Sequence, residues 1–134
     1  MKNTKQIQQL YEKLLETSEI PIIEADIFSK GIYMAKDGKK EIYLKQSLST
    51  REKLKVLLHE YGHYIHLNHY FQNESRAECE MIANSSAFII CKNQGLNIYK
   101  EPDLSKFSDN KETIKQLKST IQAVSEHIHK KLED

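Results

Sequence analysis

The chain has 134 residues, 39% hydrophobic and 29% charged, which predicts one soluble domain over 1–134 with a core that needs no disulfides. A net charge of +1 and few arginines argue against direct nucleic-acid binding, because phosphate recognition favours clustered arginine. No apolar segment resembles a signal peptide or approaches the roughly 20 residues that span a membrane. We therefore expect a cytoplasmic protein without membrane association, with Cys79 and Cys91 as reduced thiols.

The first part of the chain predicts a helix followed by a small antiparallel sheet. Residues 4–17 place apolar side chains on one helical face, and Pro21 ends that helix. Three short apolar segments then predict strands, at 21–28, 31–35 and 41–48. Asp37-Gly38, between the last two, is a frequent hairpin signal.

Three helices are predicted in the remainder, each beginning with a capping-box spacing of a small polar residue and an acidic residue three positions later. The pairs are Ser49–Glu52, Ser75–Glu78 and Asp109–Glu112. These helices cover about 50–68, from Ser75 to about 93, and about 110–132, and Gly95 is well placed to cap the second. Helix, sheet and three helices in this order predict an α+β domain.

The segment His59-Glu60-Tyr61-Gly62-His63 contains the strongest chemical signal in the sequence. On a helix, His59 and His63 lie one turn apart on one face, close enough to bind one zinc ion. Glu60 is turned about 100° from His59, so it can reach a water on the metal without being a ligand. Zinc lowers the pKa of such a water to about 7, and the carboxylate can accept its proton. The motif therefore predicts Zn²⁺-dependent hydrolysis of an amide, with Glu60 as the catalytic base.

A third zinc ligand has to come from further along the chain. His69 has the spacing of the third histidine of metzincins, but those enzymes need glycine where this chain has His66. If the helix continues, His69 lies roughly 15 Å along the axis from His59, far beyond a ligand bond of about 2 Å. His66 shares the face of the two motif histidines but lies about 4.5 Å beyond His63, so we expect a neighbour of the site.

The alternative ligand is Glu80 on the next predicted helix. Asn84 follows it by four residues and is suited to orient a histidine through its other ring nitrogen. A carboxylate near a buried face needs a partner, and a metal ion would supply one. Glu78 has a capping role, and Cys79 points about 100° away from Glu80, so core packing is the better interpretation for that thiol. We therefore favour His59, His63 and Glu80 as the metal ligands.

These residues resemble the ImmA/IrrE metallopeptidases, whose pattern is a strand, a helix with HELGH and often a later histidine, and a helix with ExxANxFA. The likeness covers about residues 20–93. The matching residues are Ile42-Tyr43-Leu44, Ser49, His59-Glu60-Tyr61-Gly62-His63, His66, Glu80-Met81-Ile82-Ala83-Asn84 and Ala87. The resemblance implies a zincin-like fold, zinc bound by His59, His63 and Glu80, and Glu60 as the base.

The chain departs from this pattern on the second motif helix. Ser86 replaces the usual phenylalanine, and Ile90-Cys91-Lys92-Asn93 replaces the usual Leu-Leu-Met-Pro ending. These departures leave the metal residues unchanged and bear on the substrate-facing rim.

The length of the chain resembles that of the short phage and mobile-element members, which implies cleavage of a helix-turn-helix transcriptional repressor as the protein substrate. A non-proteolytic antirepressor that retains the fold is the alternative, and a purely structural zinc site is a third interpretation. The sequence leaves open which residue stabilises the oxyanion. The candidate donors are Tyr64, His66, His69, Tyr70 and Tyr99. The oligomeric state stays open as well.

Overall fold

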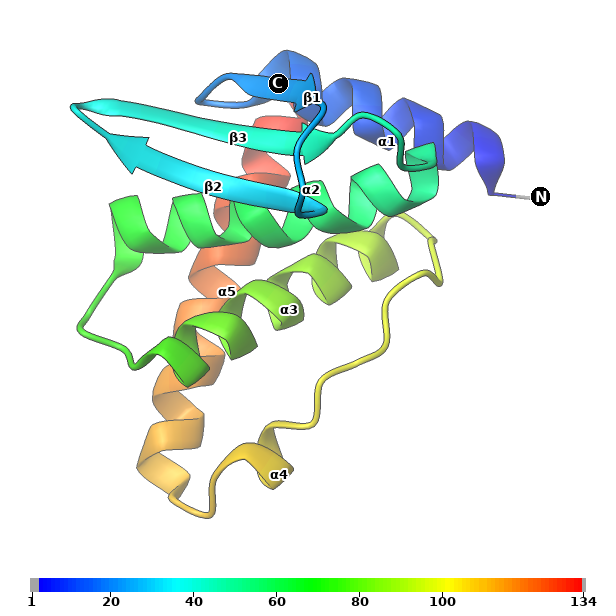
Figure 1. Ribbon diagram of the computed structural model, residues 1–134. Helices are drawn as coiled ribbons and strands as arrows, with labels where there is room; N and C mark the ends of the chain where they lie inside the picture. The colour runs from blue at the N-terminus through cyan, green and yellow to red at the C-terminus, as the bar shows by residue number, and fades with distance from the viewer. Residues whose placement is uncertain (1–2, 134) are drawn as a thin grey trace.

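The computed structural model describes residues 3–133, whose secondary structure follows the predicted order of helix, sheet and helices (Figure 1). The elements are α1 (Thr4–Thr17), β1 (Ile22–Ala25), β2 (Gly31–Lys36), β3 (Lys39–Lys45), α2 (Thr50–Ile65), the π-helical turn η1 (His66–Tyr70), α3 (Arg76–Asn93), α4 (Leu104–Phe107) and α5 (Lys111–Glu133). The α+β class is therefore confirmed. The short helix α4 lies in a segment that the sequence pattern leaves irregular.

The small sheet is mixed, so the prediction of an antiparallel sheet is wrong for one of its two pairings. The strand order is β1-β3-β2; β3 pairs antiparallel with β2 and parallel with β1. Ile42 and Leu44 of the central strand β3 are fully buried. The β2–β3 hairpin turns at Asp37 and Gly38, which both have positive φ (53° and 79°), as a two-residue type I′ turn requires.

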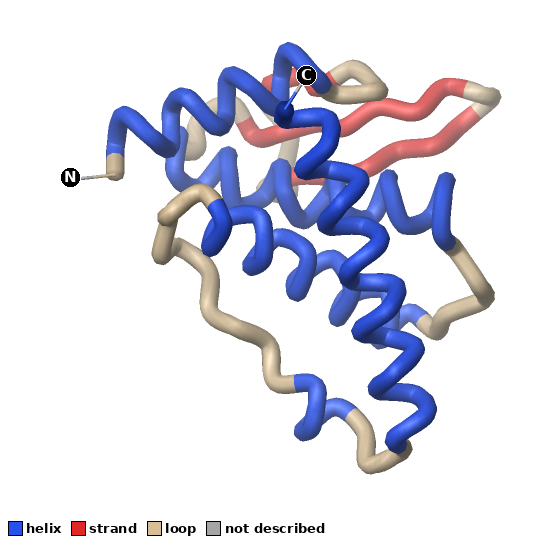
Figure 2. The backbone as a smooth tube through the Cα atoms, turned by 180° about the vertical axis from the view of Figure 1, so that it is seen from behind, coloured by secondary structure: helices blue, strands red, loops and turns tan. Residues whose placement is uncertain are grey.

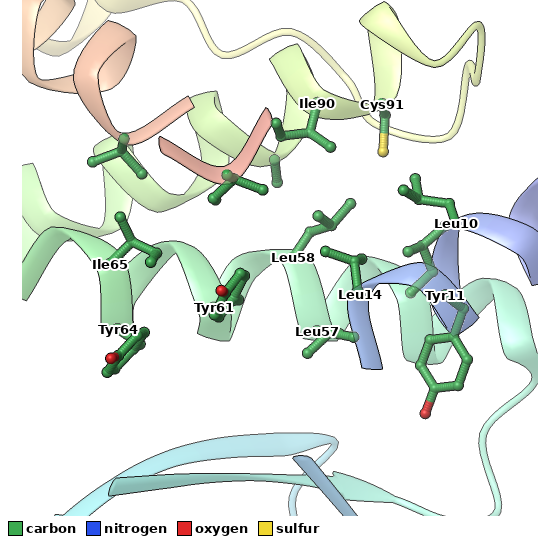
Figure 3. Packing of buried hydrophobic residues seen from close by; sticks show 14 of the residues in the cluster. Leu10, Tyr11, Leu14, Leu57, Leu58, Tyr61, Tyr64, Ile65, Ile90 and Cys91 are labelled. Atoms are coloured by element: carbon green, nitrogen blue, oxygen red, sulfur yellow. The ribbon is translucent and has the colours of Figure 1, made fainter. Parts of the chain in front are cut away.

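Helix α2 lies between the sheet on one side and α3 on the other, with α5 behind both helices (Figure 1). Seen from the opposite side, α5 crosses in front of α2 and α3 (Figure 2). The apolar side chains of α2 form the centre of the core, with Leu57, Leu58 and Ile65 fully buried. Figure 3 shows Ile90 and Cys91 of α3 extending toward α2 from the other side. Because α2 is held on both faces, the side chains that it carries have fixed positions.

Side-chain caps fix the beginnings of the helices, with one difference from the prediction. The hydroxyl oxygen of Ser49 accepts from the Glu52 amide, and Ser75 and Glu78 form the complete capping box. Asn110, not Asp109, caps α5, since its side-chain oxygen accepts from the amides of Glu112 and Thr113 at 2.9 and 3.1 Å. Several polar residues in a row offer alternative caps, and the backbone path selects one of them.

The end of α3 has the Schellman geometry that favours glycine. Gly95 has φ 74°, the Gly95 amide donates to the Lys92 carbonyl, and the Leu96 amide donates to Cys91 at 2.8 Å. The prediction of a glycine cap at this position is confirmed. The turn directs the chain into the segment that carries Tyr99 back across α2.

Gly62 marks the close approach of α2 and α3. A Cβ built on Gly62 would lie 3.5 Å from the Cα of Ala83, which is ordinary van der Waals contact. We expect Gly62→Ala to raise the free energy of unfolding by up to about 1 kcal/mol, because the methyl group fits and helix propensity improves. Gly62→Val is the matched control and should lower it by about 1–3 kcal/mol through overpacking. Denaturant titration of both variants measures the free energy of unfolding. A large loss of stability in Gly62→Ala would contradict this expectation and show that the contact between α2 and α3 has no room for a methyl group.

Candidate metal centre

The packing of α2 against α3 brings three of the predicted site residues together. The Nε2 atoms of His59 and His63 lie 3.1 Å apart. The Oε1 of Glu80 lies 3.2 Å from His59 Nε2, and its Oε2 lies 2.7 Å from His63 Nε2. These ligand atoms converge on one point from two helices. That they hold a metal ion stays a prediction, and their chemistry fits one well.

Hydrogen bonding leaves both imidazoles suited to binding a cation. The Nδ1 of His59 donates to the side-chain oxygen of Asn84 at 2.8 Å, which leaves the Nε2 lone pair free for a metal. This is the orienting contact that the sequence predicts for Asn84. Burial, together with the nearby His59, lowers the pKa of His63, although Glu80 opposes the shift. A lowered pKa favours the neutral imidazole, which is the form that binds metals.

Glu60 lies beside this cluster without belonging to it. Its Oε1 accepts a hydrogen bond of 3.0 Å from the backbone amide of Tyr33 on β2. Burial raises the pKa of Glu60, although His59 and the Tyr33 amide oppose the shift. A raised pKa makes a carboxylate a better proton acceptor near neutral pH. Tyr33 supports Glu60 through its backbone amide, and no side-chain motif in the sequence could indicate this contact.

An open pocket of about 250 Å³ adjoins His59 and Glu60. Its lining includes Tyr99, whose side chain reaches the pocket from the segment after α3. Gly31 at the start of β2 forms another part of the wall, where a Cβ would lie 2.3 Å from a methyl carbon of Val56. The pocket therefore leaves open space directly beside His59 and Glu60.

The reasoning that placed Glu80 near a buried face is wrong. The Glu80 side chain is 51% exposed, so desolvation does not force it to find a partner. Its position follows instead from the crossing of α3 over the turn of α2 that carries both histidines. The close contact of Gly62 with Ala83 sets that crossing.

His66 and His69 lie outside the cluster, as the helical spacing predicts. After Ile65 the chain does not turn back but continues in the π-helical turn η1, where the His66 amide donates to both Gly62 and His63 carbonyls. The His66 ring is fully buried, and its Nε2 lies 2.8 Å from Glu74. His69 Nε2 lies 2.8 Å from Glu19 instead.

The buried His66–Glu74 pair holds the loop between η1 and α3. His66 Nδ1 has no hydrogen-bond partner, so Glu74→Ala would leave both ring nitrogens unpaired. We expect this variant to lose about 1–3 kcal/mol of stability, measured by denaturant titration. Half-buried Glu78→Ala is the control and should lose only its cap, about 1 kcal/mol.

The same pair predicts a pH dependence. Burial raises the pKa of Glu74, but hydrogen bonds from the Gln72 amide and His66 outweigh it, so the folded-state pKa lies below its ordinary value. The stability that Glu74 contributes is therefore present above the unfolded pKa of about 4.3 and is lost as the pH falls below it. The difference between wild type and Glu74→Ala should shrink in acid; a constant difference down to pH 3 would contradict this role.

Of the five candidate oxyanion donors, Tyr99 alone lines the pocket beside His59 and Glu60. Its hydroxyl donates to the Lys55 carbonyl at 2.5 Å, so its one hydrogen is already used. The Tyr64 hydroxyl donates to Glu19, and the Tyr70 hydroxyl contacts His127. Tyr99 could therefore stabilise an oxyanion only after its hydroxyl releases the Lys55 carbonyl.

The donor set fits a catalytic zinc site better than a structural one. Among the described residues the group consists of two histidines and one glutamate, whereas structural zinc sites are usually closed by four protein ligands. Cys79 stays outside the group, and its Sγ lies 3.9 Å from the Glu74 carbonyl. Cys79 and Cys91, both on α3, are free thiols.

The residues that differ from the ImmA/IrrE pattern lie mostly in the core. Ser86 is fully buried, as are Ile90 and, nearly so, Cys91. The interpretation that these positions bear on a substrate-facing rim is therefore wrong for them.

Comparison of the chain with protein families, with curated proteins and with solved structures finds no match in any of the three. Within residues 3–133, no helix is both long and apolar enough to cross a membrane.

Proposed function

We propose that this protein is a zinc-dependent endopeptidase with a zincin-like site. The observation that carries the proposal is the convergence of His59, His63 and Glu80 within 3.2 Å of one another, with Glu60 on the adjoining part of α2. A zinc ion held there supplies Lewis acidity and lowers the pKa of a bound water to about 7.

The protein's own residues supply the proton transfers and the orientation. Glu60 accepts the proton of the attacking water and returns it to the leaving amide nitrogen. The Tyr33 amide, 3.0 Å from Glu60 Oε1, holds the carboxylate in one orientation. Asn84 holds the His59 ring through Nδ1. Each reacting group thus has a fixed support, which limits the reorganisation needed during the reaction.

An extended peptide is the substrate form that the surroundings favour. Within the described residues β2 pairs with β3 alone, so no strand covers its other edge, where the Tyr33 amide already donates to Glu60. Peptides bind such edges by adding a strand, and side-chain pockets then provide specificity. The pocket lined by Gly31 and Tyr99 lies where β2 begins, next to Glu60.

The resemblance to the ImmA/IrrE peptidases makes a helix-turn-helix repressor the proposed substrate. The alternative is an antirepressor that acts by contact without cleavage. Exposed apolar side chains favour this second candidate, since Phe28 is fully exposed and Ile32 and Met34 are about 40% exposed. Surface apolar groups of this kind mark protein-binding sites when they form a patch.

Cleavage of a repressor separates the two candidates. The zinc-loaded protein would be incubated with a purified helix-turn-helix repressor as the candidate substrate, and the products analysed by mass spectrometry. We expect discrete fragments that disappear when a chelator is present and return when zinc is restored. An uncleaved, stable complex of the two proteins would support the antirepressor and contradict the peptidase.

A further inference from the structure

Glu19, His69 and His127 form a second group of metal-binding side chains, separate from the first. Glu19 lies in the link between α1 and β1, His69 in η1, and His127 on α5. The Nε2 of His69 lies 2.8 Å from Glu19 Oε1, and the Nε2 of His127 lies 2.6 Å from Glu19 Oε2. The two imidazole rings stack with centroids 4.6 Å apart, so both Nε2 atoms face the same carboxylate.

The carboxylate at the centre of this group is ionised and firmly held. Burial raises the pKa of Glu19, but hydrogen bonds from the two imidazoles and from Tyr64 outweigh it and lower the pKa to about 2. The Tyr64 hydroxyl donates to Glu19 Oε1 at 3.0 Å, and the Glu19 amide donates to the Tyr61 hydroxyl at 3.3 Å. Both tyrosines belong to α2, so a rigid helix positions the ligand.

His127 has a partner for its second ring nitrogen. Its Nδ1 lies 2.9 Å from the Tyr70 hydroxyl, a group that both donates and accepts. When Nε2 binds a cation, Nδ1 carries the proton and donates to Tyr70, which is the support that metal-bound histidines usually have. The ring therefore needs no rotation to change from hydrogen bonding to metal binding.

We propose that Glu19, His69 and His127 bind a second divalent transition-metal ion, which joins the link between α1 and β1, the turn η1 and the helix α5. Two imidazoles and a carboxylate are the donor set of zinc, and also suit Co²⁺ and Ni²⁺. Ligand atoms on a tetrahedral zinc ion lie roughly 3.3–3.5 Å apart, given bonds of about 2.0–2.1 Å. The three ligand atoms here all lie within 4.8 Å of one another, so small side-chain shifts complete the site.

The proposed second site is open to solvent, and one lysine ammonium group competes with the ion for Glu19. A pocket of about 620 Å³ lined by residues including Glu19 and His127 opens this group to solvent. The Lys131 ammonium lies 3.9 Å from Glu19 Oε2 and opposes a second cation there. Its side chain is 39% exposed, so it can turn into solvent when the ion binds.

This ion, held like the first by three protein ligands, would stabilise the fold by joining distant segments of the chain. Glu19 and His127 are 108 residues apart in the sequence, and closing such a span by a metal bridge restricts the unfolded chain more than the folded one. The bound ion should therefore raise the thermal midpoint of unfolding, independently of any activity at His59 and His63.

Metal counting on matched variants tests the proposal. Wild type, Glu80→Ala, His127→Ala, the double variant and the control His129→Ala would be equilibrated with Zn²⁺, freed of unbound ion and analysed for zinc. His129 is a suitable control because it lies on the same helix and contacts Asn93 instead. We expect two ions per chain in wild type and His129→Ala, one in each single variant and none in the double variant.

Two results would contradict the second site. In one, wild type binds a single ion and Glu80→Ala removes it; in the other, His127→Ala still binds two ions. One ion that His127→Ala removes and Glu80→Ala keeps would support the second site and contradict the proposed peptidase. Circular dichroism would verify that each variant is folded, and His69→Ala, at a more exposed ligand, repeats the test if His127→Ala unfolds.

A second measurement isolates the site in the Glu80→Ala background. Titration with Co²⁺, followed by visible absorption, should show one binding event that Lys131→Gln strengthens several-fold, because the competing charge is gone. The thermal midpoint should rise with Co²⁺ in Glu80→Ala and stay constant in the Glu80→Ala/His127→Ala variant. Equal shifts in both would contradict the assignment.

Discussion

Glu60→Gln should lower the cleavage rate by about 10²–10⁴-fold while the metal content stays at the wild-type value. The amide has the same shape as the carboxylate and can still accept from the Tyr33 amide through its oxygen. It cannot, however, accept the proton of the attacking water. Glu60 does not belong to the group formed by His59, His63 and Glu80, so zinc binding should not change.

Single-turnover cleavage of the repressor, together with zinc analysis on the same samples, measures this effect. Glu52→Gln is the matched control, because Glu52 lies on the same helix but contacts Lys30 and Lys55. It should cleave at the wild-type rate. Unchanged biological function in Glu60→Gln would instead favour an antirepressor that works by contact.

Glu80→Ala should remove one metal ion and abolish cleavage. The carboxylate contacts both imidazoles, at 3.2 and 2.7 Å, so its loss leaves two neutral ligands and no anionic one. Two histidines at i and i+4 remain close, but a site with three protein ligands loses much of its affinity and charge neutralisation. Elemental analysis after dialysis against a low zinc concentration measures the loss.

Two further variants define what that loss means. Exposed Glu16→Ala on α1 should keep the wild-type metal content. Asn84→Ala should retain the ion with an affinity about 10–100-fold lower, because it removes only the support of His59 Nδ1. If Glu80→Ala kept its full metal content, the glutamate would not be a ligand and the comparison with glutamate zincins would fail.

The proposed second site changes how a loss of zinc in His69→Ala must be interpreted. A loss of zinc in His69→Ala would ordinarily indicate a chain reversal after His66. Here His69 is 2.8 Å from Glu19, on a continued helical turn, so the same loss reports the Glu19 group. Only the double variants separate the two origins.

Local features were predictable because they depend on neighbours in the sequence. The i, i+4 spacing placed His59 and His63 on one face and turned Glu60 aside, as helical geometry requires. The Asp37-Gly38 turn was predictable because these residue types tolerate positive φ. Two of the three helix caps were predictable because short polar side chains can accept from the first backbone amides of a helix. The third cap moved by one residue, to Asn110, because adjacent polar residues compete for it.

The sequence by itself determined the helices, the hairpin and the pairing of two histidines with a base, all set within a few residues by backbone geometry. Tertiary structure alone decided the parallel pairing of β1 with β3. Glu80 was expected near His59 and His63, but the packing of α3 on α2 is what brings it there. Tertiary structure also decided the gathering of Glu19, His69 and His127 from three distant segments. These contacts depend on how whole elements pack, and packing is fixed by the shape of the core, to which no single local pattern corresponds.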